Sequence, residues 1–302
     1  MNNKSICTNI GVIVGFCLSA LANAATVSVD CDAGNSIQAA LANVKPGDTV
    51  LASGTCNEQV SFAPEMVRIT LDGQKKTTIQ HPGKAPSPHT VFIRGKDITV
   101  KGITVVGGLD GIHLSGPASA ELDGNVVNKT ARAGIHIDKG SIARIINNTI
   151  EGSGAYGIDI TGVSLAYIGL RIPRIPALSP NTIRNNGAAG INIERSSSAW
   201  IVGNTISNNK GSGIVVHRNA QADIMANVID ANGGDGITAS HGSGISLRSD
   251  PRKDAPNQTA QANGGAGIKC MIGGYVEGPL GTLSGARGAK AIESGCVDRV
   301  AQ

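Results

Sequence analysis

The chain has 302 residues, of which 26 are Lys or Arg and 22 are Asp or Glu, so its formal net charge is +4. This charge is too small to indicate a nucleic-acid-binding protein. Aromatic residues make up only 2% of the chain. Proteins that bind neutral sugars usually stack them on aromatic rings, so the composition favours recognition by charge.

The first residues have the pattern of a secretory signal. Lys4 begins a short polar start, residues 10–21 form an apolar run, and Ala22-Asn23-Ala24 offers a small-residue cleavage site. The apolar run is shorter than the ~20 residues that a membrane-spanning helix needs, and no later segment is apolar enough to span. We expect residues 1–24 to be removed and the mature protein to be secreted or periplasmic. Its net charge would then be +3, because 25 basic and 22 acidic residues remain.

Four cysteines remain after this segment, two near each end of the chain: Cys31, Cys56, Cys270 and Cys296. Export favours oxidation, and proximity favours disulfides between Cys31 and Cys56 and between Cys270 and Cys296. Four cysteines allow three connectivities, so this pairing depends on proximity alone. A metal site is the alternative, but no C-x-x-C motif is present.

The segment after the signal has the features of an end cap. Ser36 can cap an amphipathic stretch that runs from Ile37 to Val44 and stops at the Pro46-Gly47-Asp48 turn. A coil of stacked repeats exposes its core and its strand edges at each end, so a capping helix is expected here. We assign residues 25–60 to this cap and the first strand.

A Gly-Ile pair then recurs along the chain in steps of 23, 23, 33, 23 and 23 residues. A second marker, Asn followed two residues later by an aliphatic residue, keeps the same steps and places the ten extra residues in the same interval. Self-similarity at a fixed period indicates stacked units. The pairs begin at Gly111, Gly134, Gly157, Gly190, Gly213 and Gly236, and the asparagines are Asn125, Asn148, Asn181, Asn204 and Asn227.

Each repeat contains three short strands. In residues 134–156, Ile135 and Ile137 alternate with polar residues, a second strand covers residues 142–146, and a third follows the turn at Asn148. A unit of about 23 residues leaves no room for a crossover helix, so each strand must pair in parallel with its equivalent one repeat later. We predict an all-β fold, a right-handed parallel β-helix of three sheets, over residues 61–272, with a C-terminal cap over 273–302.

The repeat also resembles a known family. The run GINIERSSSAWIVGNTISNNKGSGI (residues 190–214) is similar to the repeat of right-handed parallel β-helix proteins of the pectate-lyase-like superfamily. The resemblance spans about residues 36–272 and implies that the asparagines stack in the turn between the second and third sheets. This superfamily includes pectin and alginate lyases, polygalacturonases, epimerases, phage tailspikes and adhesins, so the fold alone does not give the function.

The strand that opens with Gly-Ile presents its third and fifth residues outward, and the resemblance implies that this outer face forms the substrate groove. The third-place column is His113, His136, Asp159, Asn192 and Val215, and the fifth-place column is Ser115, Asp138, Thr161, Glu194 and His217. Lys139, Arg195 and Arg218 follow directly after these strands.

Four of these residues are candidate catalytic groups: His136, Asp138, Asp159 and Glu194. Strand geometry places the backbone of Asp159 roughly 8 Å from those of Asp138 and Glu194, within the separation of inverting glycosidase carboxylates, and His136 ~4.8 Å from Asp159. Close carboxylates raise one another's pKa and hold a nearby histidine charged, which divides acid from base roles. The same groups are also compatible with a divalent cation such as Ca²⁺.

Substrate contacts are expected from the remaining polar and charged positions. Cationic side chains can pair with uronate carboxylates, so an acidic polysaccharide is the expected partner, bound by a monomer without nucleic acid. The expected binding residues are His113, Tyr156, Asn192, Arg195, His217, Arg218, Lys139 and Arg248. As an enzyme, the protein would be a lyase, hydrolase or epimerase, with His136 or Asp159 as the base.

A non-catalytic role fits the same columns equally well. The N-x-D, paired Gly-Asp-Asp and R-I-K signatures of polygalacturonases and the D-P-H-D motif of alginate epimerases are missing, and Val215 interrupts the polar column. Any solvated sheet face is polar, so a surface or carbohydrate-binding β-helix protein remains the alternative. A copper-handling protein would need Met or Cys ligands on the groove.

Two interruptions of the period carry further expectations. The ten extra residues fall within 162–180, where they either build a wall of the groove or form a tolerated surface loop. A second Gly-Ile pair at Gly244 lies 23 residues before Gly267, so we expect it to continue the repeat, with eight further residues between Gly236 and Gly244. This suggests that His241, Arg248, Arg252 and Lys253 edge the same face.

Overall fold

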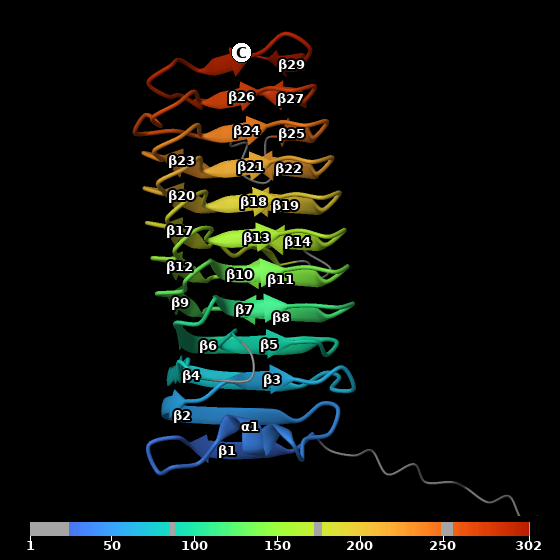
Figure 1. Ribbon diagram of the computed structural model, residues 1–302, viewed down its shortest axis with the longest axis vertical. Helices are drawn as coiled ribbons and strands as arrows, with labels where there is room; N and C mark the ends of the chain where they lie inside the picture. Colours follow the sequence, from blue (N-terminus) through green and yellow to red (C-terminus); the bar gives the residue numbers. More distant parts are fainter. Residues whose placement is uncertain (1–23, 85–87, 172–176, 249–255, 302) are drawn as a thin grey trace, which may run out of the picture.

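The computed structural model describes residues 24–84, 88–171, 177–248 and 256–301. The expected signal segment lies outside them except for its last residue, Ala24. The described part of the chain winds into a long column of stacked turns, with its first and last strands, β1 (Thr26–Asp30) and β29 (Val297–Ala301), at opposite ends of the column (Figure 1). In these residues no helix is long and apolar enough to cross a membrane.

The Gly-Ile strands stack into one parallel ten-stranded sheet, which we call the first sheet. Its central strands pair in the predicted register, with Ile135 opposite Ile158 and Ile191 opposite Ile214. The strands are β3 (Val60–Phe62), β5 (Val91–Ile93), β7 (Asp110–Leu114), β10 (Ala133–Ile137), β13 (Ile158–Ile160), β18 (Ile191–Ile193), β21 (Ile214–Val216), β24 (Ile237–Ala239), β26 (Ile268–Cys270) and β28 (Lys290–Ile292).

The other two strands of each repeat belong to one 17-stranded sheet that bends at the asparagine turn. We call its two parts the second and third faces. The second face holds β1 (Thr26–Asp30), β2 (Thr49–Asn57), β4 (Thr70–Gln80), β6 (Ile98–Val106), β8 (Ser119–Asp123), β11 (Ile142–Ile146), β14 (Leu165–Ile168), β19 (Ser198–Val202), β22 (Gln221–Met225), β25 (Gly244–Arg248), β27 (Tyr275–Pro279) and β29 (Val297–Ala301).

The third face holds the C-terminal parts of the long strands β4 and β6, followed by the third strand of each later turn. These strands are β9 (Val126–Asn128), β12 (Thr149–Glu151), β17 (Thr182–Arg184), β20 (Thr205–Ser207) and β23 (Val228–Asp230). The predicted three-sheet parallel coil of about 23 residues per turn is therefore confirmed, and β27, β28 and β29 continue it through residue 301.

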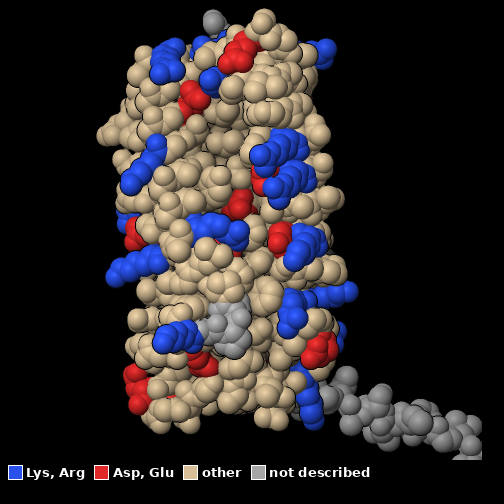
Figure 2. Space-filling model, in the orientation of Figure 1, with Lys and Arg blue, Asp and Glu red and all other residues tan. Residues whose placement is uncertain are grey.

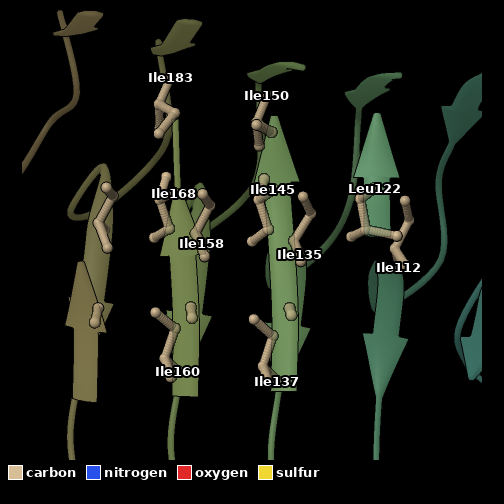
Figure 3. Packing of buried hydrophobic residues seen from close by; sticks show 14 of the residues in the cluster. Ile112, Leu122, Ile135, Ile137, Ile145, Ile150, Ile158, Ile160, Ile168 and Ile183 are labelled. Carbon is tan, nitrogen blue, oxygen red and sulfur yellow. The ribbon is translucent and has the colours of Figure 1, made fainter. Parts of the chain in front are cut away.

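Aliphatic side chains from all three directions fill the column. Ile112, Ile135 and Ile158 stack along the first sheet and meet Ile145 and Ile168 of the second face (Figure 3), and all five are fully buried. Period-two alternation in each short strand sends every second side chain to this core, and the fixed turn length repeats the same contact. The core therefore repeats from one turn to the next.

Asparagines stack in two lines rather than one. In the expected line, each side-chain amide donates to the next Asn Oδ1, as from Asn204 to Asn227 at 3.1 Å. A second line runs through Asn186, Asn209, Asn232 and Asn263 in the turn before the first sheet, at 2.9 to 3.0 Å. Both lines satisfy buried backbone groups that the turns would otherwise leave without partners.

The ten-residue insertion leaves the coil after β14, on the side of the asparagine turn. It forms a small antiparallel pair, β15 (Leu170–Arg171) with β16 (Ala177–Leu178). Arg171 reaches back to Glu121 and Asp123 at 3.1 and 2.6 Å. The described part of this insertion therefore borders the second face and does not line the first sheet.

The second interruption is also placed differently from the expectation. Gly244 pairs with Gln221 in the second face, so this Gly-Ile pair does not open a strand of the first sheet. Asn257 continues the asparagine line directly after Asn227. Seven of the eight extra residues therefore lie between Arg248 and Asn257, largely outside the described residues. Arg252 and Lys253 also lie outside them.

Near the first turns of the coil, α1 (Ile37–Leu41) provides one short helical segment. Ser36 accepts a hydrogen bond from the Ala39 amide as its N-cap, and Ile37 and Leu41 are buried against the coil. The expected amphipathic stretch is helical only over these five residues. Its capping role, like the segment boundaries at residues 60 and 272, stays a prediction.

Both expected disulfides are present, Cys31–Cys56 and Cys270–Cys296. They close loops of 25 and 26 residues at the two ends of the coil and point to an extracellular or periplasmic location. We expect Cys270→Ser with Cys296→Ser to lower the free energy of unfolding by about 3 kcal/mol, because the denatured chain regains loop entropy. Thermal unfolding of this variant beside Cys31→Ser/Cys56→Ser checks it, and an unchanged Tm in both variants would contradict it.

Candidate functional site

The predicted outward columns lie on the outer face of the first sheet, in register with one another. Phe92, His113, His136, Asp159 and Asn192 occupy equivalent positions on consecutive turns. These side chains point away from the core and yet are not open to solvent, since His136 is only 4% and Asp159 only 6% exposed. The sequence predicted their face correctly and their exposure incorrectly.

Histidines and carboxylates alternate along this buried part of the face, which we call the His-Asp ladder (His113, Asp138, His136, Asp159). His113 Nε2 lies 3.3 Å from Asp138 Oδ1, and His136 Nε2 lies 3.7 Å from Asp138 Oδ2. His136 Nδ1 is 2.9 Å from Asp159 Oδ2, and Asn192 donates to the other Asp159 oxygen at 2.9 Å. His136 is thus held between two carboxylates.

This arrangement sets the charges in the ladder. Burial alone would lower the pKa of His136, but hydrogen bonds to Asp138 and Asp159 outweigh it and raise that pKa to about 9. Burial raises the pKa of Asp138, but hydrogen bonds from His113, His136 and Ser115 bring it well below its usual range. Burial lowers the pKa of His113. At neutral pH the ladder therefore contains a charged His136 beside a neutral His113.

The ladder continues into three residues that the sequence analysis missed. Asp110 is fully buried, lies 3.0 Å from His89, and receives two hydrogen bonds from Arg132 at 2.8 and 2.5 Å. Burial raises the pKa of Asp110, but the hydrogen bonds from His89 and Arg132 outweigh burial and bring that pKa well below its usual range. One signal was available, because Asp110 precedes a Gly-Ile pair where the next turns carry Ala133 and Tyr156.

A second, more accessible group surrounds Glu194, and we call it the Glu194 cluster (Tyr156, Glu194, Arg195, His217, Arg218). Glu194 accepts from Arg218 at 2.6 Å, and it lies 3.3 Å from His217 Nε2 and 3.6 Å from Arg195 Nε. Both arginine side chains are more than half exposed. The cluster therefore offers solvent two cations and an imidazole around one carboxylate.

The pKa values in this cluster move in opposite directions. Burial lowers the pKa of His217, outweighing the nearby Glu194 carboxylate. Burial raises the pKa of Tyr156, and the charges of Asp159 and Glu194 add to it. At neutral pH the imidazole is a proton acceptor while the phenol keeps its proton.

Two further predicted residues, Lys139 and Arg248, lie outside both the His-Asp ladder and the Glu194 cluster. Lys139 is exposed and follows β10 in the same left-handed turn position that Arg195 and Arg218 occupy, with φ of 53°. Arg248 lies on the second face, where its Nε is 3.4 Å from Asp223. The structure therefore does not bring Arg248 together with the other predicted residues, because the strand that ends there belongs to another sheet.

The described residues offer few ligand sets for a metal. The groups whose ligand atoms converge are His89 with Asp110 and His113, His113 with His136 and Asp138, and the Cys31–Cys56 disulfide with Glu58. Each contains a single carboxylate. Ca²⁺ takes six to eight oxygen ligands, so the described groove residues do not fit a Ca²⁺ site.

The raised pKa of His136 predicts a specific dependence of stability on pH. A pKa of about 9 in the fold and about 6.5 in the unfolded chain give stability that is complete below about pH 6.5 and lost as pH rises through the folded value. The difference amounts to roughly 3 kcal/mol. We expect His136→Gln to remove this alkaline loss in a series of unfolding curves from about pH 6 to pH 10. A His81→Gln control should keep it, and equal slopes in both variants would contradict the assignment.

Comparisons with known proteins agree with this architecture. A family model described as "Right handed beta helix region" matches residues 110–274, more than half of the chain. A search among curated protein sequences found no significant match. Among solved structures, pectate lyase Pel9A has a TM-score of 0.60 at 13% identity, covering 92% of this chain and 78% of that one.

A mutant of the periplasmic alginate epimerase AlgG has a TM-score of 0.50 at 17% identity, covering 91% of this chain and 67% of that one. The Dettilon tailspike protein gives 0.49 at 13% identity, covering 92% and 60%. The structural similarity to Pel9A supports the fold. Identities this low do not transfer an activity. The predicted pectate-lyase-like architecture is confirmed, and by its repeats, its three parallel sheets and the family match, this chain belongs to the right-handed β-helix family.

Proposed function

We propose that this exported protein acts on an acidic, uronate-containing polysaccharide at the outer face of the first sheet. The observation that carries the proposal is the Glu194 cluster, in which a neutral imidazole, a protonated phenol and two exposed arginines surround one carboxylate. These groups match the needs of proton abstraction next to a carboxylate. The two disulfides support export.

Arg195 and Arg218 have the chemistry to hold the substrate carboxylate. Planar guanidinium groups pair with carboxylates through two parallel hydrogen bonds, and neutralising the carboxylate makes the adjacent carbon–hydrogen bond more acidic. Both side chains are tethered at one side by Glu194 and stay largely exposed. They are therefore oriented and still accessible to a polymer.

His217 is the proposed base. His217 Nε2 is buried and lies 3.3 Å from Glu194 Oε2 without a hydrogen bond. The negative carboxylate favours the imidazole hydrogen on this nitrogen, and Nδ1 is then left to accept a proton. The proton would pass from the carbon that bears the uronate carboxylate to Nδ1. In a lyase, the released electron pair forms a double bond and expels the neighbouring glycosidic oxygen, which Tyr156 protonates. In an epimerase, Tyr156 returns a proton to the opposite face of the same carbon.

His136 takes a different role from the one that the sequence suggested. Because its pKa is about 9, it is charged at neutral pH and is a poor base. In this proposal the contacts of His136 hold the Asp138 and Asp159 side chains in place beneath the groove. Asp138 and Asp159 are positioning residues, since both are engaged by His136.

The proposal is tested with the mature protein and a panel of pectate, alginate and glycosaminoglycan, with and without Ca²⁺. We expect unsaturated ends or altered epimer content in one uronate polymer, and the same rate after chelation of Ca²⁺, because the groove residues do not fit that ion. An Arg195→Ala/Arg218→Ala variant should raise KM for that polymer by about a hundredfold or more. Measurable binding without any chemical change in any polymer would instead favour a non-catalytic carbohydrate-binding protein.

A further inference from the structure

Three aromatic side chains that reach the surface lie on the second face. Tyr167 and Trp200 lie side by side on β14 and β19, and Tyr275 lies further along on β27. Trp200 is 43% exposed, and it is the only tryptophan of the chain. Among the other rings of the described residues, Phe62 is buried in the core, Phe92 lies against His113 and Tyr156 belongs to the Glu194 cluster, so this face holds three of the five accessible rings.

Two shallow hollows flank this aromatic pair. The first, about 280 Å³, is lined by Thr99, Glu121, Ile142, Arg144 and Tyr167 among others. The second, about 320 Å³, is lined by Trp200, Gln221, Asp223, Arg248, Tyr275 and Glu277 among others. Tyr167 and Trp200 meet edge to face with ring centroids 5.7 Å apart, so they form a ridge between the hollows.

Charged side chains around the hollows are paired with each other. Arg144 lies 3.0 Å from Glu121, Arg248 lies 3.4 Å from Asp223, and the Arg299 guanidinium stacks 5.9 Å from the Tyr275 ring. Paired charges of opposite sign leave little net field for a charged polymer. They still present planar hydrogen-bonding groups, which suit hydroxyl groups. On the face seen in Figure 2, Lys and Arg side chains are scattered along the column, and several of them lie beside Asp or Glu.

We propose that the second face binds a neutral polysaccharide chain that lies along the axis of the coil. Sugar rings present weakly positive carbon–hydrogen bonds that rest on the negative face of an aromatic ring, while their hydroxyls bond to paired Arg, Asp and Glu side chains. The face between β6 and β27 spans seven strand spacings, or about 34 Å, which is long enough for several sugar units. Such a site is separate from the cationic Glu194 cluster, so it would hold a second, uncharged polymer.

The insertion after β14 supports this assignment. Arg171 joins Glu121 and Asp123 at the border of the first hollow. Arg171 thereby holds both carboxylates at the edge of the hollow. Without the insertion, Glu121 would keep only its bond from Arg144, and Asp123 only its bond from Asn147. The longest departure from the repeat among residues 111–236 thus borders the aromatic face.

Trp200 makes the proposal testable without a label. Because no other tryptophan exists, its fluorescence reports only on this face. The mature protein is titrated with soluble oligosaccharides of glucose, mannose and xylose, and calorimetry repeats each titration. We expect a saturable change of Trp200 emission with one neutral series, and about a tenfold weaker Kd in both Tyr167→Ala and Tyr275→Ala.

Leu109→Ala, an exposed apolar residue beside the first sheet, is the matched control and should keep the wild-type Kd. The proposal is overturned if no neutral oligosaccharide changes the emission or releases heat, or if the tyrosine variants bind as tightly as the wild type. An emission change on dilution of the protein alone would show a self-association surface instead, and would also overturn it. None of these outcomes depends on activity toward acidic polymers, so this inference and the proposed function fail separately.

Discussion

Replacing His217 with alanine is expected to lower kcat on the uronate polymer by about 10² to 10⁴-fold, the usual contribution of a positioned general base. The neutral imidazole is the best-placed proton acceptor in the Glu194 cluster, since Arg195 and Arg218 cannot accept a proton. KM should change little, because both arginines keep their contacts to Glu194. The measurement is initial rate against polymer concentration for the wild type and the variant.

The pH profile separates a catalytic role from a structural one. The pKa of His217 is lowered by burial, so the wild-type rate should rise with pH through a value below about 6.5 and then level off. The variant should lose this acidic limb, and Tyr156→Phe should retain it at a lower rate. His81→Ala, outside the first sheet, serves as the control. If His217→Ala kept the wild-type rate and acidic limb, the base would have to be another residue.

Replacing Asn204 with alanine is expected to lower the free energy of unfolding by roughly 3 to 5 kcal/mol, since several buried groups lose their partners at about 1 to 3 kcal/mol each. The Asn204 side chain donates to the carbonyls of Ile168 and Val202 and accepts from the Asn181 amide. Asn204 is fully buried, so water cannot replace these bonds without opening the coil. Denaturant unfolding followed by circular dichroism measures the change.

Asn43→Ala is the matched control, because Asn43 is exposed and lies outside both asparagine lines. We expect less than about 0.5 kcal/mol there. Asn209→Ala, in the second line, should resemble Asn204→Ala, since Asn209 makes the equivalent bonds to Asn186, Ile183 and Asn232. A small effect at Asn204 would mean that the turn can rearrange around the missing amide.

Much of the fold was predictable because the residues within one repeat are enough to indicate its strands and turns. The alternation of Ile135 and Ile137 predicts the first strand of a repeat, and Asn148 marks the turn between its second and third strands. A fixed period then places equivalent residues on top of one another, so register follows by counting. Where the count changes, the prediction weakened: Gly244 was assigned to the wrong sheet because a Gly-Ile pair also fits the second face.

The candidate site was predictable only in part. Counting placed His136 opposite Asp159 and grouped Glu194 with His217 and Arg218, and the structure shows these contacts. Counting from the Gly-Ile pairs did not include Asp110, His89 or Arg132, because these residues lie before a pair or in a turn without one. It also could not show that His136 is buried and charged, because that depends on how neighbouring turns cover it.

By itself the sequence determined the parallel coil, its three faces, its asparagine turns and its disulfides, since all of these follow from a repeated local pattern and from proximity along the chain. Only the tertiary structure decided the charges and surfaces. Several features depend on the distances between side chains of different repeats. They are the hydrogen bonds and ion pairs between residues 24 to 33 apart, the aromatic ridge of Tyr167 and Trp200, and the position of the insertion. The repeat spacing predicts which face of the coil a residue occupies, but the contacts between neighbouring turns determine its burial and its charge.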